Sequence, residues 1–447
     1  MQENDFKQLI ENALTEAMKK GIDAADVIAF HKNTVSVNVR NQALEKVKKA
    51  SSIELGLRVF KGKRQALVST TDTSFDSLVD MAQQAVDMVK HVPEDPYCGL
   101  AENFAKADQI PSIDLFDSTE CSIDELIERA KTCEENARSI KGVTNIETSG
   151  TTFSTYLTGV ANSHGFMNTY SQSSHQIFIG AIAGEGLDKQ IEFDGTNRIY
   201  FNELEDPTAL GKRVAEMAVK KLNPRKISSQ KVPVVFHPRV GQNIINYFAE
   251  SINGQKVCQA GLSYLQHEMN KLIFSPGITI VDDATRARGL ASYPVDVEGV
   301  LPQKRLLVEK GVLKSWLLDT RSAMKMELKS TGHAVRTTRS TPSPTSSNLY
   351  LEPGQVSFED LIKSIKNGFF VTDLLGHGFS SVTGDYSEGA SGFWIENGQI
   401  SYPVQQITIA GTFKEMLKNI TVANDLKFNY ATNTPTFVIE GMTLAGV

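Results

Sequence analysis

The spacing of apolar residues divides the first ninety residues into strands flanked by helices. Apolar residues at helical spacing predict an opening amphipathic helix: Phe6, Ile10, Ala13 and Ala17. Alternation of apolar and polar residues predicts strands over 35–39 and 53–59, and the Lys-Gly-Lys turn at 61–63 leads into a third strand over 65–69. Helical spacing returns over 73–90. Strands packed against helices on an antiparallel sheet are typical of an α+β domain.

The following segment contains a predicted linker, two marked helix starts and a run of strands. Residues 91–111 are rich in proline and aspartate, which predicts a linker. Ser122 and Glu125 form the S-x-x-E pattern of a capping box, so a helix is expected from there to about residue 138. Residues 142–201 predict a meander of short strands. The Asp-Pro pair at 206–207 begins another helix, with the aspartate as N-cap.

Strands dominate the second half of the chain. Residues 232–236 predict a short strand and 238–252 a helix with one apolar face, which ends at Gly254. Residues 337–347, rich in serine, threonine and proline, predict a long polar loop, a type that is usually functional or mobile. From Ile278 onward the pattern predicts strands, with helices at 320–328, 357–366 and 412–420.

Together these patterns predict an α+β protein with two main domains. Residues 1–225 form an N-terminal α+β part with mixed or antiparallel sheets, and a further boundary is expected near 91–111. Residues 226–447 form a strand-rich C-terminal part with a few helices. A chain of 447 residues is long enough for two or three domains.

The densest local pattern in the chain is the glycine-rich block 384–398. Asn397-Gly398 separates two apolar runs, and this pair favours the positive φ angles of a type I′ turn, so a β-hairpin is predicted. Glycine and serine before a strand allow another backbone to approach closely. The block therefore indicates either a surface that faces a second chain or peptide, or a glycine-rich packing corner within this chain.

The same block carries a family resemblance. From Gly384-Asp385-Tyr386-Ser387 to Gly398, the sequence resembles the TldD/PmbA family, also described as U62-like peptidases or modulators of DNA gyrase, and within it the PmbA (TldE) branch. The resemblance runs along nearly the whole chain and is strongest after Val232. Supporting matches lie at 276–283, 292–294, 296–299, 402–404, 407–411 and 439–443.

The resemblance implies a metal in the TldD branch, held by an HExxxH motif on a helix and a later cysteine. Histidines at this spacing reach one zinc ion, and the glutamate acts as base on the bound water. The equivalent helix in this chain, 241–253, contains no histidine, and the late loop 425–435 contains no cysteine. We therefore expect no metal and no catalytic residue in this chain, and a metal, zinc by the ligand types, in a TldD-like partner.

Other motifs that would carry chemistry are incomplete. His267-Glu268 begins an HExxH pattern, but Lys271 stands where the second histidine is needed, so an exposed polar pair on a helix is expected. The block lacks a G-x-S-x-G elbow and a phosphate-binding loop. The residues predicted to line a substrate channel or an interface are Gly384, Asp385, Tyr386, Ser387, Gly389, Ser391, Gly392, His333 and His377.

Composition narrows the setting. The net charge of −6 gives no basic footprint for nucleic acid, and no stretch approaches the roughly 20 apolar residues of a membrane span. The start of the chain, Met1 to Asp5, is acidic and unlike a signal peptide. The four cysteines show no CxxC spacing and are read as free thiols. A cytoplasmic protein that binds neither membranes nor nucleic acid directly is therefore expected.

The resemblance implies a subunit of a TldD/TldE-type metalloprotease complex that cleaves unstructured peptides. On this reading the chain partners a TldD-like subunit, forms walls of a substrate channel and pairs with itself when alone. Two alternatives remain open: a self-sufficient metallopeptidase, and a non-enzymatic regulatory protein acting on DNA gyrase.

Overall fold

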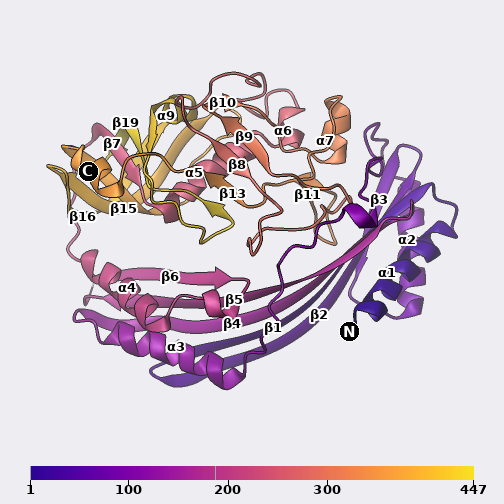
Figure 1. Cartoon of the computed structure of the whole chain (residues 1–447), viewed down its shortest axis with the longest axis horizontal. Helices are drawn as coiled ribbons and strands as arrows, with labels where there is room; N and C mark the ends of the chain where they lie inside the picture. Colours follow the sequence, from indigo (N-terminus) through magenta and orange to yellow (C-terminus); the bar gives the residue numbers. More distant parts are fainter. Residues whose placement is uncertain (1, 187, 447) are drawn as a thin grey trace.

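The computed structural model describes residues 2–186 and 188–446. Figure 1 shows a long curved sheet from the first half of the chain, with helices at its two ends and the C-terminal half above its concave side. The structure therefore confirms a mixed α+β fold with several sheets, of which the last includes a closed barrel.

The N-terminal sheet is antiparallel and has the strand order β3-β2-β1-β4-β5-β6. Several of its strands are far longer than the alternation of apolar residues predicts, and the expectation of short strands over 142–201 is wrong. Its strands are β1 (Ala24–Arg40), β2 (Ala43–Lys61), β3 (Arg64–Thr70), β4 (Val143–Asn162), β5 (Met167–Ala183) and β6 (Gln190–Arg198).

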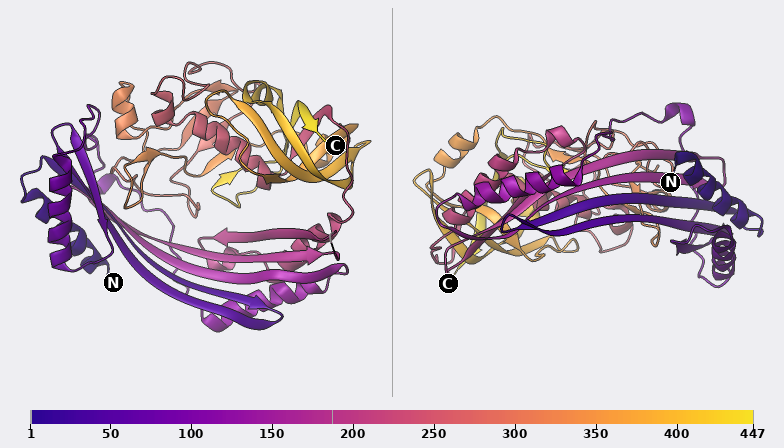
Figure 2. Two further views of the ribbon diagram at one scale, coloured as in Figure 1. Left: turned by 180° about the vertical axis from the view of Figure 1, so that it is seen from behind. Right: turned by 90° about the horizontal axis from the view of Figure 1, so that it is seen from below.

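Two pairs of helices cover the convex face of this sheet at opposite ends, as the right-hand view of Figure 2 shows. The helices α1 (Glu3–Met18) and α2 (Phe75–Val89) bury the apolar side chains near the start of β1 and the end of β2. At the other end lie α3 (Ile123–Arg138) and α4 (Pro207–Lys220). The helices contribute apolar stripes while the strands contribute alternate residues, so each pair closes a separate core.

The predicted helix caps are present. Ser122 Oγ accepts a hydrogen bond from Glu125 N at 3.2 Å, and Glu125 Oε2 accepts one from Ser122 N at 2.9 Å, which is the reciprocal capping box. Asp206 Oδ1 accepts from Ala209 N at 3.0 Å, with proline in the first turn of α4. These local signals were sufficient to locate both helix starts.

The C-terminal half contains a barrel. Its sheet has the order β16-β15-β14-β7-β19-β17, and the additional pairing of β16 with β19 closes a ring of five strands. β7 and β14 run parallel, and the other neighbours in the ring run antiparallel. The strands are β7 (Gln230–Phe236), β14 (Asn367–Leu375), β15 (Asp385–Glu396), β16 (Gln399–Thr412), β17 (Ile420–Val422) and β19 (Phe437–Ala445).

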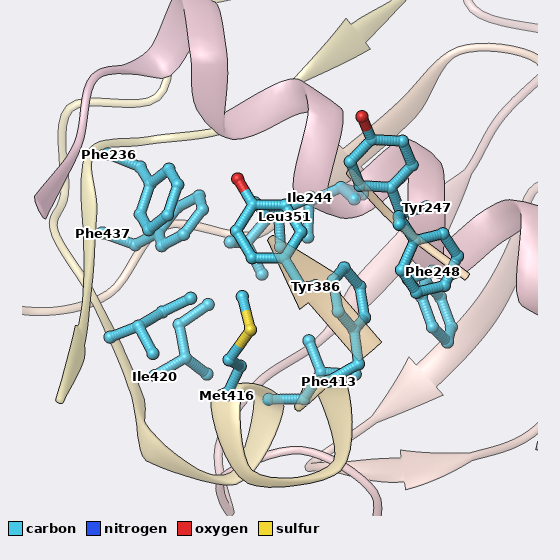
Figure 3. Packing of buried hydrophobic residues seen from close by; sticks show 14 of the residues in the cluster. Phe236, Ile244, Tyr247, Phe248, Leu351, Tyr386, Phe413, Met416, Ile420 and Phe437 are labelled. Atoms are coloured by element: carbon cyan, nitrogen blue, oxygen red, sulfur yellow. The ribbon is translucent and has the colours of Figure 1, made fainter. Parts of the chain in front are cut away.

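The largest core of the molecule fills the barrel and the space beside it. The helix α5 (Pro238–Ser251) follows β7 and buries Ile244 and Phe248 against barrel residues. Figure 3 shows these side chains packed with aromatic and aliphatic residues from the barrel strands and from α9 (Phe413–Met416). The close packing of many apolar side chains makes this core rigid, and the core holds the residues at the start of β15 in place.

Smaller elements complete the C-terminal half. The helices predicted at 320–328 and 357–366 are shorter than expected, whereas α9 and the 3₁₀ turn Leu417–Asn419 together cover nearly all of the helix predicted at 412–420. The pair at 267–268 lies in a turn rather than on a helix. A five-stranded sheet comprises β10 (Val312–Leu313), β9 (Arg305–Glu309), β8 (Ile280–Asp282), β13 (Leu349–Leu351) and β18 (Thr432–Asn433). The others are α6 (Gly254–Val257), α7 (Thr320–Lys325), α8 (Phe358–Lys363), β11 (Ala334–Val335) and β12 (Ser343–Pro344).

The polar segment 337–347 connects the two halves of the molecule. Thr338 Oγ1 donates to Glu54 Oε2 at 3.1 Å. Next to this segment, Arg336 Nη2 donates to Asp26 Oδ1 at 2.6 Å, and Asp26 also pairs with Arg58. These three charged residues are buried, so the halves are joined by a buried ionic contact. The division into domains at 225/226 stays a prediction.

Candidate functional site

The block 384–398 forms β15 and its turn into β16. Asn397 and Gly398 have φ angles of 49° and 76°, and Glu396 pairs with Gln399, which confirms the predicted two-residue hairpin. β15 has β14 on one side and β16 on the other. Its backbone groups are therefore used within the barrel along most of its length.

The glycines of the block accommodate neighbouring parts of this chain. A Cβ on Gly392 would lie 2.9 Å from the carbonyl carbon of Phe370 on β14, and one on Gly389 would lie 3.2 Å from the Leu375 oxygen. Gly384 has a φ of 77° and lies against the ring of Tyr264. The close approach predicted for these glycines exists, and the backbone that approaches Gly389 and Gly392 is β14.

Side chains of β15 alternate between the barrel interior and the surface. Tyr386 and Glu388 are buried, whereas Asp385 and Ser387 are exposed and Ser391 is half-buried. Asp385 Oδ2 accepts a hydrogen bond from Thr383 Oγ1 at 2.7 Å. The predicted channel or interface role of these residues stays a prediction, and the exposed ones are those able to meet another chain.

A buried carboxylate lies under the barrel rim. Glu388 is 2% exposed, and Tyr247 of α5 donates to it only through long hydrogen bonds of 3.4 Å to each oxygen. Burial raises the pKa of Glu388, and burial together with this carboxylate raises the pKa of Tyr247 to about 12. In Figure 3 the hydroxyls of Tyr247 and Tyr386 point in the same direction, away from the apolar cluster. This group is a candidate proton-holding site at the rim.

The two histidines chosen from the sequence occupy different environments. His377 is exposed and its ring lies edge-on to Tyr247, with centroids 5.1 Å apart. His333 is buried and is held by Thr331 Oγ1 at 2.8 Å and Asp282 Oδ1 at 3.0 Å. His333 therefore has the contacts of a structural histidine, whereas His377 adjoins the Glu388 group.

The helix α5 and the short strand β18 lie together, as the resemblance implies for a metal site. Their contact is a hydrogen bond of 2.7 Å from Thr432 Oγ1 to Asn246 Oδ1, between two neutral groups. Within residues 2–186 and 188–446, no cluster of three or more histidine, cysteine, aspartate or glutamate side chains could hold a metal ion. A hydroxyl and an amide do not provide the thiolate and imidazole ligands that zinc favours, so the residues here do not fit a zinc site.

A cavity of about 570 Å³ lies beside this helix–strand contact, between β6, the start of α5 and the segment 425–436. His237 caps α5, with its Nδ1 accepting from Arg239 N at 3.1 Å; burial, with the Arg239 charge second, lowers the pKa of His237 to about 4. Arg239 pairs with Glu192 on β6 and Asp373 on β14. No local sequence pattern indicates this cavity, because β6, α4, α5, α8, β14 and the segment 425–436, which lie far apart in the chain, all line it.

A cysteine–histidine–aspartate group lies beneath the start of α3. Cys121 Sγ is 3.7 Å from His175 Nδ1, and His175 Nε2 is 3.5 Å from Asp117 Oδ2. Burial raises the pKa of the Cys121 thiol to about 11, and burial lowers the pKa of His175. Both shifts oppose the thiolate–imidazolium pair that a cysteine nucleophile needs, so the arrangement is a packing contact rather than a catalytic site.

Three family models match successive parts of the chain. They are described as PmbA/TldA metallopeptidase domain 1, central domain and C-terminal domain, and they match residues 25–89, 116–222 and 229–446. The chain belongs to the PmbA/TldD family. The predicted family is thereby confirmed.

Relatives and solved structures agree with this membership. "Metalloprotease PmbA" of Escherichia coli O157:H7 is 34% identical over 98% of this chain and 97% of its own length. A "metalloprotease TldD homolog" of Buchnera aphidicola subsp. Acyrthosiphon pisum is 31% identical over 42% of this chain and 37% of its own. The PmbA/TldD match therefore extends over the whole chain with PmbA and over a smaller part with TldD.

Two solved structures share the fold. A putative modulator of DNA gyrase from Bacteroides thetaiotaomicron has a TM-score of 0.92 at 25% identity, with full coverage of both chains. TldE from Thermococcus kodakarensis has a TM-score of 0.88 at 22% identity and covers 98% of this chain and 100% of its own.

Among the described residues, no helix is both long and apolar enough to cross a bilayer.

Proposed function

We propose that this PmbA/TldD-family chain is the subunit without the metal in a two-subunit protease that cleaves unstructured peptides. The observation that carries the proposal is the neutral Asn246–Thr432 contact where α5 meets β18. Family membership supplies the metallopeptidase chemistry, and a TldD-type subunit would hold the ion. This chain would contribute substrate surface and stabilise its partner.

The exposed rim of the barrel is the substrate surface that the proposal assigns to this chain. Asp385, Ser387 and His377 are exposed there, and the His377 ring contacts Tyr247, which donates to Glu388. An extended peptide passing this rim would meet hydrogen-bonding groups from several side chains. Such a surface suits a protease of disordered segments, because it recognises an extended chain more than a particular sequence.

The test separates a metal-free subunit from a self-sufficient enzyme. The purified chain, a TldD-like subunit and their mixture are assayed on an unstructured peptide, and zinc is measured in each. We expect cleavage and stoichiometric zinc in the mixture, with zinc in the TldD-like subunit and none in this chain. Stoichiometric zinc and chelator-sensitive cleavage by this chain alone would overturn the proposal.

A second experiment tests whether one histidine on α5 is enough to give this chain a zinc site. In the purified chain without a partner, Asn246→His is compared with Asn246→Gln, which retains an amide. Neither variant is expected to give this chain zinc or activity alone, because further ligands are missing on α5 and β18. Recovery of zinc binding by Asn246→His alone would show that the site is closer to a functional one than we propose.

The second function class is regulation of DNA gyrase, the role that the Bacteroides protein of the same fold is named for. A gyrase-binding protein needs no basic surface for DNA, so the charge of this chain does not decide the matter. Capture with a tagged chain distinguishes the two: we expect enrichment of a TldD-like chain. Enrichment of gyrase without that chain would favour regulation.

A further inference from the structure

The strand β2 has a long edge without a partner strand. β3 pairs with β2 only over Leu55–Lys61, so residues 43–54 have β1 on one side and no strand on the other within 2–186 and 188–446. At about 3.4 Å per residue this edge is about 40 Å long. Open strand edges that are neither covered nor short can pair with other strands; charges on the edge disfavour partners of like charge and favour partners of opposite charge.

The register shows which backbone groups point outward. The Phe60 carbonyl accepts from Asp23 N at 2.9 Å, on the β1 side, and the pairing of β1 with β2 runs without a shift from Phe60 to Lys46. Successive residues direct their N–H and C=O groups to opposite sides of a strand. Val47, Lys49 and Ser51 therefore present these groups to the open edge.

The side chains along this edge are also uncovered. All ten residues from 43 to 52 are exposed, including Leu44 at 48% and Val47 at 38%. Val47 lies opposite Val37, which is buried beneath α3, so the helix layer stops one strand before the edge. A hollow of about 330 Å³ crosses β2, β1 and β4 beside Lys49 and Phe153. An added strand would continue the sheet, and its side chains would continue the apolar layer that Val37 forms with α3.

The lysines along this edge indicate the charge of a segment that could pair with it. Lys46, Lys48 and Lys49 form no ion pair among the described residues, in a chain whose net charge is −6. Two registers of pairing with a second copy bring lysines together: a two-fold axis through Val47 would place Lys46 opposite the partner's Lys48, and an axis through Lys48 would place it opposite itself. Like charges directly opposite on neighbouring strands are destabilising, and opposite charges are stabilising.

We propose that an acidic, extended segment of the partner subunit pairs with the open edge of β2 and continues the N-terminal sheet across the interface. The inference rests on the proposed two-subunit function for the identity of the partner. Main-chain hydrogen bonds at Val47, Lys49 and Ser51 provide the pairing, and aspartate or glutamate side chains opposite the lysines set its register.

Hydrogen exchange tests the edge directly. Amide exchange of residues 43–54 is compared in the free chain and in the complex with a TldD-like subunit. The outward amides have no hydrogen-bond partner within residues 2–186 and 188–446, so we expect at least about tenfold slower exchange at Val47, Lys49 and Ser51 in the complex. Amides that point toward β1 serve as the internal control, because they are bonded in both states.

Two variants probe the backbone and the charges separately. Val47→Pro removes one outward N–H and leaves the β1 pairing intact, whereas Val47→Thr retains it. Lys46→Glu with Lys48→Glu reverses the charge and is matched by Lys212→Glu with Lys220→Glu on α4. We expect at least about tenfold weaker association for Val47→Pro and for the edge reversal, and less than about twofold change for both controls. If Val47→Pro does not fold, the charge reversal alone decides.

The outcomes separate this inference from the proposed function. A complex that forms with unchanged exchange at 43–54, and with variants that bind like the unaltered chain, overturns the edge assignment and leaves the two-subunit function standing. If no complex forms, both fail. Slower exchange at the edge when the free chain self-associates would make a second copy the occupant and overturn the acidic partner strand.

Discussion

The barrel and the long N-terminal sheet treat their strand edges in opposite ways. In the barrel, pairing of β16 with β19 closes the ring, so each of its five strands has a strand on both sides. In the N-terminal sheet, β6 has an edge covered by side chains: Arg239 Nη1 donates to the Phe193 carbonyl at 2.9 Å, and Asp194 Oδ1 accepts from Gly195 N at 2.8 Å. In the part of the chain that the structure describes, no side chain covers the edge of β2 over 43–52 in this way. Stability is therefore expected to be concentrated in the barrel, and assembly at the open sheet.

The largest expected effect is on the barrel. Gly392→Val would force a side chain against the Phe370 backbone of β14, and neither strand can move without disturbing the ring. We expect the free energy of unfolding to fall by more than about 4 kcal/mol, or the chain not to fold. Denaturant titration measures the change. Gly99→Val, where the nearest atom to a Cβ is 4.0 Å away, is the control, and an equal loss there would remove the argument from close approach.

The contact between the two regions should give the next largest effect. Asp26 accepts from Arg58 and from Arg336, and all three are buried. Asp26→Asn keeps the shape but leaves two buried guanidinium groups without their shared counter-ion. We expect a loss of about 3 kcal/mol in the free energy of unfolding, measured by denaturant titration. Asp23→Asn, at an exposed ion pair with Lys61, is the control and should change stability by less than about 1 kcal/mol.

The sequence predicted features that depend on neighbours along the chain. The hairpin at Asn397-Gly398 and the caps at Ser122 and Asp206 each need only a few adjacent residues, and the structure has all three. The closure of the barrel was not predictable in this way, because it depends on pairing β7 with β14 and β19, which lie more than a hundred residues later. Non-local pairing has no local signature.

The open edge was missed for a different physical reason. Alternation reveals a strand when one face is buried, but residues 43–52 are exposed on both faces and therefore carry no such pattern. The turn before them, Asn41-Gln42, has positive φ angles at both residues without a glycine. Its N–H groups donate to the buried Glu134 carboxylate on α3 at 2.8 Å each, a contact that only the fold creates.

The free energy of unfolding should depend on pH through the buried carboxyl group of Glu388. Burial raises the pKa of Glu388, so the folded state holds this proton at pH values where the unfolded chain has lost it. Stability is then expected to fall as the pH rises from about 4.5 through the folded-state pKa. Glu388→Gln should remove this decline and stabilise the chain at pH 7 by about 1 kcal/mol, measured by unfolding at several pH values. Glu396→Gln, on the exposed end of β15, is the control. If Glu396→Gln also removed the decline of stability with pH, the decline would not be due to Glu388.

The smallest effect on stability is expected at His377, a residue of the proposed substrate surface. His377 is exposed and contacts Tyr247 only edge-on, so His377→Ala should alter the free energy of unfolding by less than about 0.5 kcal/mol. If the rim faces the substrate, the same variant should lower peptide cleavage by the two-subunit complex severalfold while complex formation is unchanged. His164→Ala, on the turn between β4 and β5, is the matched control. Cleavage that is unchanged by His377→Ala would leave the barrel as a structural base only, and would place this chain's contribution to the protease at the interface formed by the N-terminal sheet.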